Sequence, residues 1–112
     1  MINTWKDLNK AFPMYRDDMT EEQERDFVKH CFDLYEKEGF AKVFWSPFDI
    51  GNTELCGKSF KVLNRVTEAQ ESLEVLPMWN IEFENGHKMC AYPEEVIPRE
   101  MKDNGCKLNN IA

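Results

Sequence analysis

The most regular pattern of apolar and polar positions lies in residues 76–92, where the two kinds alternate on both sides of Asn85-Gly86. Asn-Gly is a strong hairpin signal because a type I′ turn needs positive φ at both central positions. A two-residue turn would place Ile81 opposite Cys90. It would also gather the core-forming side chains on one face, namely Trp79, Ile81, Phe83, Cys90 and Tyr92. We therefore predict a β-hairpin over residues 76–92.

A short helix is predicted over residues 4–12. Trp5, Leu8 and Phe12 recur at the spacing of one helix face, and Thr4 can act as the N-cap. This segment should therefore present one apolar face to the rest of the protein.

A longer helix is predicted over residues 20–38, beginning with a capping box at Thr20. Apolar residues follow at helical spacing, and we expect this stripe to cover the hairpin through Phe27, Cys31 and Tyr35. Other apolar residues widen the stripe: Val28, Phe32 and Leu34.

Residues 59–67 predict a further strand, since apolar and basic residues alternate along most of it. Positions 63–64 break the alternation, and a β-bulge there would restore it. If this strand lies beside the hairpin, Lys61 and Arg65 should pair with Glu82 and Glu84 on its outer face.

These elements predict an α+β protein with one domain over residues 1–112. Residues 1–39 form the helical part, residues 40–98 the β part and residues 99–112 a polar C-terminal tail. Residues 40–45 fit a strand, although a continuation of the helix is the alternative. The helices should pack on a small antiparallel sheet.

Short strands and glycine-bearing turns from Gly57 to Ile97 resemble an SH3-like small β-barrel. This resemblance implies a barrel in place of an open sheet, and it implies peptide recognition by exposed aromatic residues. The chain as a whole also resembles small bacterial proteins of the kind carried on mobile elements. That second resemblance assigns no functional residue.

Composition and charge narrow the function classes. The chain has 112 residues, 42% hydrophobic, with formal net charge −7. No apolar run is long enough to cross a bilayer, and the first residues lack the basic start and apolar run of a signal peptide, so we expect a cytoplasmic protein without a membrane partner. The acidity disfavours nucleic-acid binding. A nucleic-acid binder acting through Lys58, Lys61 and Arg65 stays as a further alternative.

The candidate catalytic groups are few. A two-residue turn would place Glu84 opposite His87, near Cys90, which suggests a small enzyme or small-molecule binder with a cleft there. A hairpin tip excludes little water, and the cysteines lack the paired spacing of zinc ligands. We therefore expect no enzymatic activity, no metal and no cofactor.

Two surfaces are candidates for binding a protein partner. Trp45, Phe48 and Asp49 place two large aromatic rings beside a Pro turn. Glu21 and Glu22 belong to an acidic stretch that would suit a basic partner. The sequence thus favours a small non-enzymatic binding or adaptor protein, with pairing of two copies through a strand edge as a further option.

Overall fold

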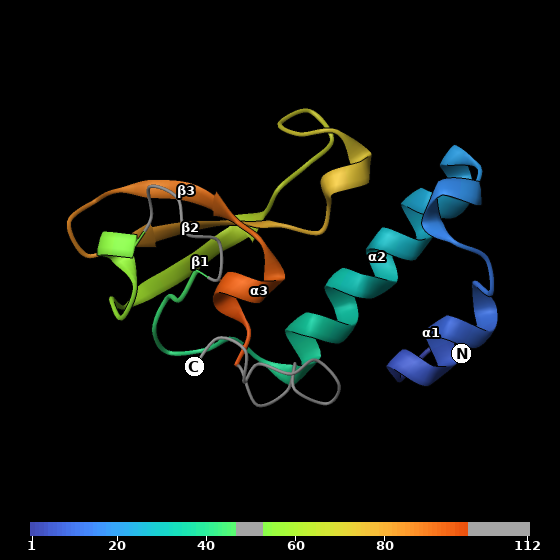
Figure 1. Cartoon of the computed structure of the whole chain (residues 1–112), viewed down its shortest axis with the longest axis horizontal. Helices are drawn as coiled ribbons and strands as arrows, with labels where there is room; N and C mark the ends of the chain where they lie inside the picture. The colour runs from blue at the N-terminus through green and yellow to red at the C-terminus, as the bar shows by residue number, and fades with distance from the viewer. Residues whose placement is uncertain (47–52, 99–112) are drawn as a thin grey trace.

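The computed structural model describes residues 1–46 and 53–98. Figure 1 shows the sheet, the long helix α2 and the short helix α1 side by side, in that order across the molecule. The described elements are α1 (Trp5–Ala11), the 3₁₀ turn η1 (Arg16–Asp18), α2 (Glu21–Glu38), η2 (Thr53–Leu55), β1 (Phe60–Arg65), η3 (Leu73–Val75), β2 (Trp79–Phe83), β3 (Lys88–Ala91) and α3 (Pro93–Val96). The α+β class is confirmed.

The two predicted helices form with the predicted caps. The hydroxyl of Thr4 accepts the N–H of Asp7 at 3.0 Å at the start of α1. Thr20 and Gln23 form a reciprocal capping box at the start of α2. None of the described helices has the length and hydropathy needed to cross a membrane.

The sheet has three antiparallel strands in the order β1-β2-β3. It remains open, with β1 and β3 at its edges, so the SH3-like barrel considered for residues 57–97 is not closed. An open sheet needs cover on its apolar face, and α2 supplies part of that cover.

The predicted bulge in β1 is confirmed between Val62 and Asn64. The additional residue shifts the alternation, so that Arg65 lies opposite the core residue Trp79. Only Lys61 makes the predicted pair, with its Nζ 3.7 Å from Glu82. The expected pairing of Arg65 with the outer face of the hairpin is therefore wrong.

The hairpin forms, but its turn is one residue longer than predicted. Phe83 N–H donates to the carbonyl of His87 at 2.8 Å, leaving a three-residue loop over residues 84–86. Among the described residues only glycines have positive φ, and Gly86 has φ of 89°. A type I′ turn would need positive φ at Asn85 as well, whereas a three-residue loop needs it only at its last position.

The longer turn shifts β3 by one residue relative to β2. Ile81 lies opposite Met89, and Asn80 lies opposite Cys90. The predicted inward orientation of Cys90 and Tyr92 is thus wrong, because a one-residue slip exchanges the two faces of a strand. Met89 and Ala91 take the inward positions instead.

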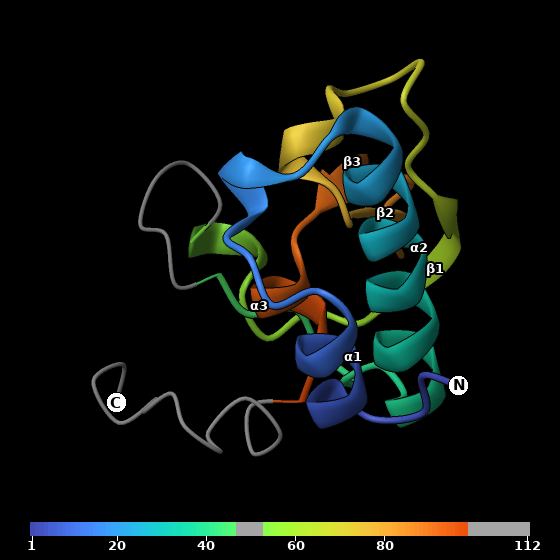
Figure 2. The same cartoon turned by 90° about the vertical axis from the view of Figure 1, so that its right-hand side faces the viewer.

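Helix α2 is buried on two sides. Val28 and Phe32 belong to the main core with the sheet, whereas Cys31 and Leu34 form a second core with Leu8 of α1. Figure 2 shows α1 lying alongside α2 on the side away from the sheet. The prediction that Cys31 covers the hairpin is therefore wrong, since a helix touching two neighbours divides its apolar residues between them.

Trp79 is the centre of the main core and has no exposed surface. Its ring makes edge contacts with three aromatic rings, at centroid distances of 5.2 Å to Phe40, 5.3 Å to Phe32 and 5.8 Å to Tyr35. Its indole N–H donates to Glu36 at 2.9 Å. Trp79 therefore fixes α2 on the sheet by apolar and polar contacts together.

Candidate functional site

Residues 40–45 form neither a helix nor a regular strand; Val43 makes an isolated antiparallel bridge with Ser59. The segment is nevertheless held on two sides by backbone hydrogen bonds. These are Ala41 N–H to Val96 at 2.7 Å, Phe44 N–H to Lys58 at 2.9 Å, Gly57 N–H to Phe44 at 2.7 Å and Trp45 N–H to Glu95 at 3.2 Å. The backbone beneath Trp45 is thus tied both to α3 and to residues 57–58.

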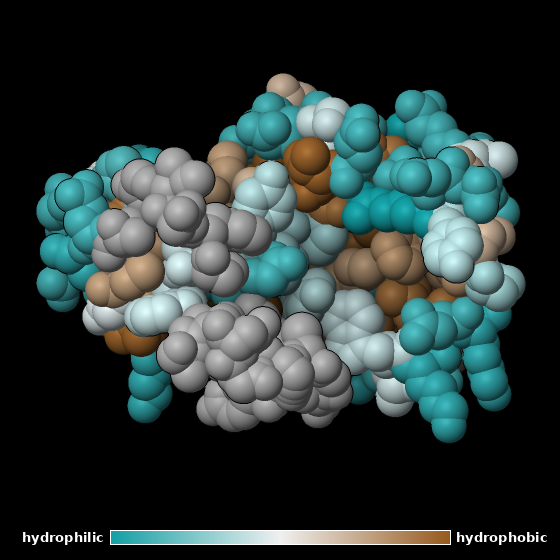
Figure 3. All heavy atoms as spheres, in the orientation of Figure 1, coloured by the Kyte–Doolittle hydropathy of each residue, from teal (hydrophilic) through white to brown (hydrophobic). Residues whose placement is uncertain are grey.

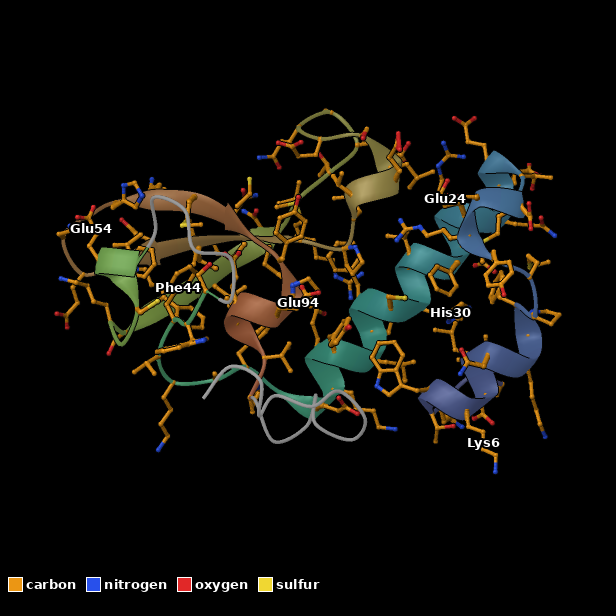
Figure 4. All side chains as sticks on the ribbon, in the orientation of Figure 1. Lys6, Glu24, His30, Phe44, Glu54 and Glu94 are labelled. Carbon is orange, nitrogen blue, oxygen red and sulfur yellow. The ribbon has the colours of Figure 1, made fainter. Side chains whose placement is uncertain are left out.

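Side chains alternate along this extended segment. Phe44 is fully buried, and its ring lies 5.3 Å from that of Phe83; Figure 4 labels it within the β part of the molecule. The neighbouring side chains are left partly accessible, with Val43 43% and Trp45 38% exposed. Burial of Phe44 therefore positions Val43 and Trp45 at the surface.

A buried polar cluster supports the same segment. The carboxylate of Glu95 is buried and accepts the hydroxyl of Ser46 at 3.1 Å through Oε2. Its Oε1 accepts the N–H of Tyr92 at 2.9 Å. The N–H of Ser46 points to Cys56 Sγ at 3.3 Å. Bonds of this kind offset the cost of burying a carboxylate and hold α3 against the segment.

Tyr92 precedes α3 and is 38% exposed. We call the three partly exposed residues Val43, Trp45 and Tyr92 the Trp45 surface; the backbone N–H of Trp45 donates to the carbonyl of Glu95, and that of Tyr92 to its carboxylate. Phe48 and Asp49, the other predicted members of this site, lie outside the described residues.

The acidic candidates lie at the other end of the molecule. Glu21 and Glu22 are exposed at the start of α2, far from the 41–46 segment in Figure 1. Glu21 lies 3.9 Å from Arg25, an exposed pair of the weak i,i+4 kind. Glu24 is used within the fold, because its carboxylate binds Arg16 at 2.8 Å. The structure therefore keeps the two predicted binding surfaces apart.

The structure does not bring together His87 and Cys90, the residues named for a cleft near the hairpin tip. His87 is exposed and its ring stacks on Phe83 at 5.9 Å. Cys90 belongs to the opposite set of alternating positions, and its thiol lies 3.3 Å from the amide oxygen of Asn80. Burial raises the pKa of the Cys90 thiol, which lowers the thiolate fraction. The two groups therefore do not converge.

Cys31 is buried between α1 and α2, and His30 beside it is half-buried. Burial raises the pKa of Cys31 to about 12, which leaves this thiol protonated and unreactive at neutral pH. His30 lies 3.7 Å from Asp26 on its own helix, and Figure 4 shows it on the α1 side of α2. Within residues 1–46 and 53–98 no group of three or more metal-ligating side chains could hold a metal ion.

Two of the three basic residues proposed for nucleic acid, Lys61 and Arg65, lie beside carboxylates, whereas Lys58 is exposed. Arg65 binds Glu36 and Asp33 of α2. Lys61 lines a pocket of about 310 Å³ together with Glu82 and Glu84, so acidic groups face the same space. A phosphate backbone would meet carboxylates there.

Sequence reasoning missed the cluster around Glu95. One local signal was present: Pro93 stands at the first helical position and Glu95 at the third, a typical helix start. The hydrogen-bond partner of Glu95 could not be predicted from the sequence, because Ser46 is 49 residues away in the chain.

Figure 3 shows hydrophilic residues around the margins of one face, with hydrophobic side chains reaching the surface over the middle of α2. The Trp45 surface lies on backbone held by the buried Glu95 cluster, and no converging set of catalytic groups is found among the described residues. No family model, curated protein or solved structure matches this chain.

Proposed function

We propose that this protein is a small non-enzymatic binding module whose contact with a protein partner is centred on Trp45. The observation that carries the proposal is a tryptophan 38% exposed on a segment that is hydrogen-bonded on two sides. Tryptophan and tyrosine dominate binding energy at protein interfaces, because they bury much area while losing few rotatable bonds. The proposal places the protein in the cytoplasm, in keeping with the reduced thiols at Cys31 and Cys90.

The hydrogen bonds that hold the backbone at Trp45 support a rigid contact. Glu95, Ser46 and Phe44 are buried, so the backbone at Trp45 loses little freedom when a partner binds. Tyr92 adds a second amphipathic ring that is 38% exposed, and its backbone N–H is bonded to the same Glu95. The expected partner is a protein segment with an apolar side chain that can cover an indole ring.

Site-specific photocrosslinking tests this proposal. A photoreactive phenylalanine analogue at position 45 should give a discrete adduct in cells that carry the gene, and excess unlabelled wild-type protein should suppress it. Excess Trp45→Ala protein should not. The matched control is the same analogue at Tyr15, an aromatic residue 83% exposed just before η1. Equal adducts from positions 45 and 15, or equal competition by both proteins, would refute the proposed contact.

The acidic start of α2 is the second candidate contact. Glu22 is exposed and makes no ion pair with another described residue, in a chain of net charge −7. A basic partner would associate faster at low salt through such a surface. Glu21→Gln together with Glu22→Gln should then weaken the salt dependence of association with this basic partner. An unchanged salt dependence would exclude this surface.

A further inference from the structure

The loop between β2 and β3 contains the pair Asn85-Gly86 and lies at the end of the sheet away from α2 (Figure 1). Both residues are exposed to solvent. An asparagine followed by glycine is open to spontaneous deamidation, because glycine has no side chain to hinder attack by its backbone nitrogen on the asparagine amide. The pair that forms this turn is therefore also the most labile kind of asparagine site.

The reaction needs no catalyst and only water as co-reactant. The backbone nitrogen of Gly86 forms a bond to the side-chain Cγ of Asn85, and its proton leaves with the side-chain nitrogen as ammonia. Water then opens the cyclic imide at either of its two carbonyls and returns a proton to the nitrogen of Gly86. The product is aspartate or isoaspartate, so a neutral amide is replaced by a carboxylate without any transfer of electrons.

In the closed loop both reacting groups are held by hydrogen bonds. The N–H of Gly86 donates to the carbonyl of Phe83 at 2.9 Å, and the side-chain oxygen of Asn85 accepts the N–H of His87 at 3.0 Å. The nitrogen of the imide carries no hydrogen, so the bond to Phe83 cannot survive ring closure. The reaction therefore requires the loop to open first, and its rate should follow the population of the open loop.

We propose that Asn85 is a deamidation site that the closed loop protects and that reacts only in molecules whose hairpin tip has opened. Isoaspartate adds a methylene group to the main chain before Gly86 and places a carboxylate beside Glu84. Because strand register depends on loop length, the lengthened loop cannot re-form both hydrogen bonds. Opening of the tip thus leads to a permanent covalent change. The loop shares no residue with the Trp45 surface, so either proposal can fail alone.

Mass spectrometry of peptides from the full-length protein, kept in native buffer or in urea at the same pH, tests the protection. Asn104-Gly105 is a second pair of the same kind, so in urea the two sites should react at similar rates. Deamidation of Asn85 in native buffer should be at least about tenfold slower than in urea, because it waits for the loop to open. Asn80 is followed by Ile81 and should stay unmodified over the same period.

Substitutions at Glu84 change how readily the loop opens and leave the reacting pair intact. Glu84 is exposed and takes the first central position of the turn between Phe83 and Gly86, where proline is favoured. Glu84→Pro should slow the native reaction and Glu84→Gly should speed it, each by roughly twofold to fivefold. Glu84→Gln is the control for the lost charge and should react like the wild type. The rate of each variant in urea corrects for changes in intrinsic reactivity.

Two results would overturn the protection. One is a native rate at Asn85 equal to or above the rate in urea, which would mean that the N–H of His87 activates the amide. The other is an equal native rate in Glu84→Pro and Glu84→Gly. The purified isoaspartate form should also show faster hydrogen exchange at the N–H of Phe83, which donates across the loop to His87 at 2.8 Å. Unchanged exchange there would contradict the permanent change at the tip.

Discussion

Arg65 joins the sheet to α2 through one side chain. Its Nε and Nη2 donate to the two carboxylate oxygens of Glu36 at 2.9 and 2.7 Å, and Nη2 also reaches Asp33 at 2.9 Å. Glu36 in turn accepts the indole N–H of Trp79. A bidentate pair of this kind is stronger than a single surface contact because both oxygens are held in fixed geometry.

Replacing Arg65 should therefore cost more than replacing a comparable lysine on the same strand. We expect Arg65→Met to lower the free energy of unfolding by about 1–2 kcal/mol, since the network is partly exposed. Lys61→Met breaks an exposed pair at 3.7 Å and should cost at most about 0.5 kcal/mol. Urea unfolding measures both, and equal losses would contradict a special role for Arg65.

The contact between Arg65 and Glu36 should also change how the stability of the protein depends on pH. The hydrogen bonds from Arg65 hold the pKa of Glu36 below its ordinary value of 4.5. A carboxylate with a lowered pKa stabilises the fold above the unfolded-state value, and this stabilisation is lost as the pH falls through the folded-state value. Stability should thus decline less steeply below pH 4.5 in Arg65→Met than in the wild type. An equal decline of stability with falling pH in both proteins would contradict this effect of Arg65 on Glu36.

At the level of elements, α2 separates two cores. Leu8 is buried where α1 meets α2, and the thiol of Cys31 lies in the same cluster. The position of α1 therefore controls access of solvent to Cys31.

Leu8→Ala should destabilise the protein by about 2–4 kcal/mol and should speed labelling of Cys31 by a thiol reagent, because the cavity loosens α1. Mass spectrometry of labelled peptides distinguishes Cys31 from the other cysteines. Leu63→Ala removes a leucine that is 39% exposed on β1 and should leave the labelling rate unchanged. Acceleration by both variants would indicate general loosening instead.

The hairpin shows how far local sequence determines an element. Asn85-Gly86 correctly predicted that a hairpin forms, since few residue pairs favour such a tight reversal. Turn length was missed because Asn85 is compatible with either loop, and here its side chain accepts the N–H of His87 at 3.0 Å. Because the loop is one residue longer than predicted, Met89 faces the core in place of Cys90.

Gly86 is the residue on which this loop depends. Its φ of 89° is strained for residues with a Cβ atom, although a Cβ there would meet no atom within 4 Å. Gly86→Ala should therefore cost about 1–2 kcal/mol through backbone strain alone. Gly86→Asn should cost less, because asparagine tolerates this conformation better. Thermal unfolding ranks the two variants, and the reverse order would contradict the loop assignment.

For the whole molecule, the two cores share Phe27 and Tyr35 of α2. Loss of packing on the sheet should therefore also destabilise the contact between α1 and α2, and unfolding should occur in one transition.

Phe83→Ala tests this coupling. Phe83 is buried in the sheet and contacts Phe44, so its truncation should cost about 3–5 kcal/mol. Far-ultraviolet circular dichroism, which follows the helices, should shift together with tryptophan fluorescence. A native-like melting curve would contradict the core assignment, and two separated transitions would show that the α1 side unfolds independently.

Contacts between distant residues limited prediction of the whole molecule. Arg16 illustrates this limit, since its guanidinium donates to the carbonyls of Leu73 at 2.8 Å and Leu76 at 2.7 Å. Nothing near Arg16 in the chain indicates those partners. The sequence indicated Trp45 as a candidate contact residue, whereas its exposure and its support by Glu95 required the fold.

The bulge in β1 has a consequence for how this gene can change in length. Leu63 is the residue that opposes no partner of its own, so loss of its codon would leave its neighbours Val62 and Asn64 opposite their present partners. Loss of the Lys61 codon would instead shift the strand and expose Phe60 on the wrong side. Insertions and deletions among descendants of this sequence should therefore accumulate at Leu63 and be purged from the rest of β1.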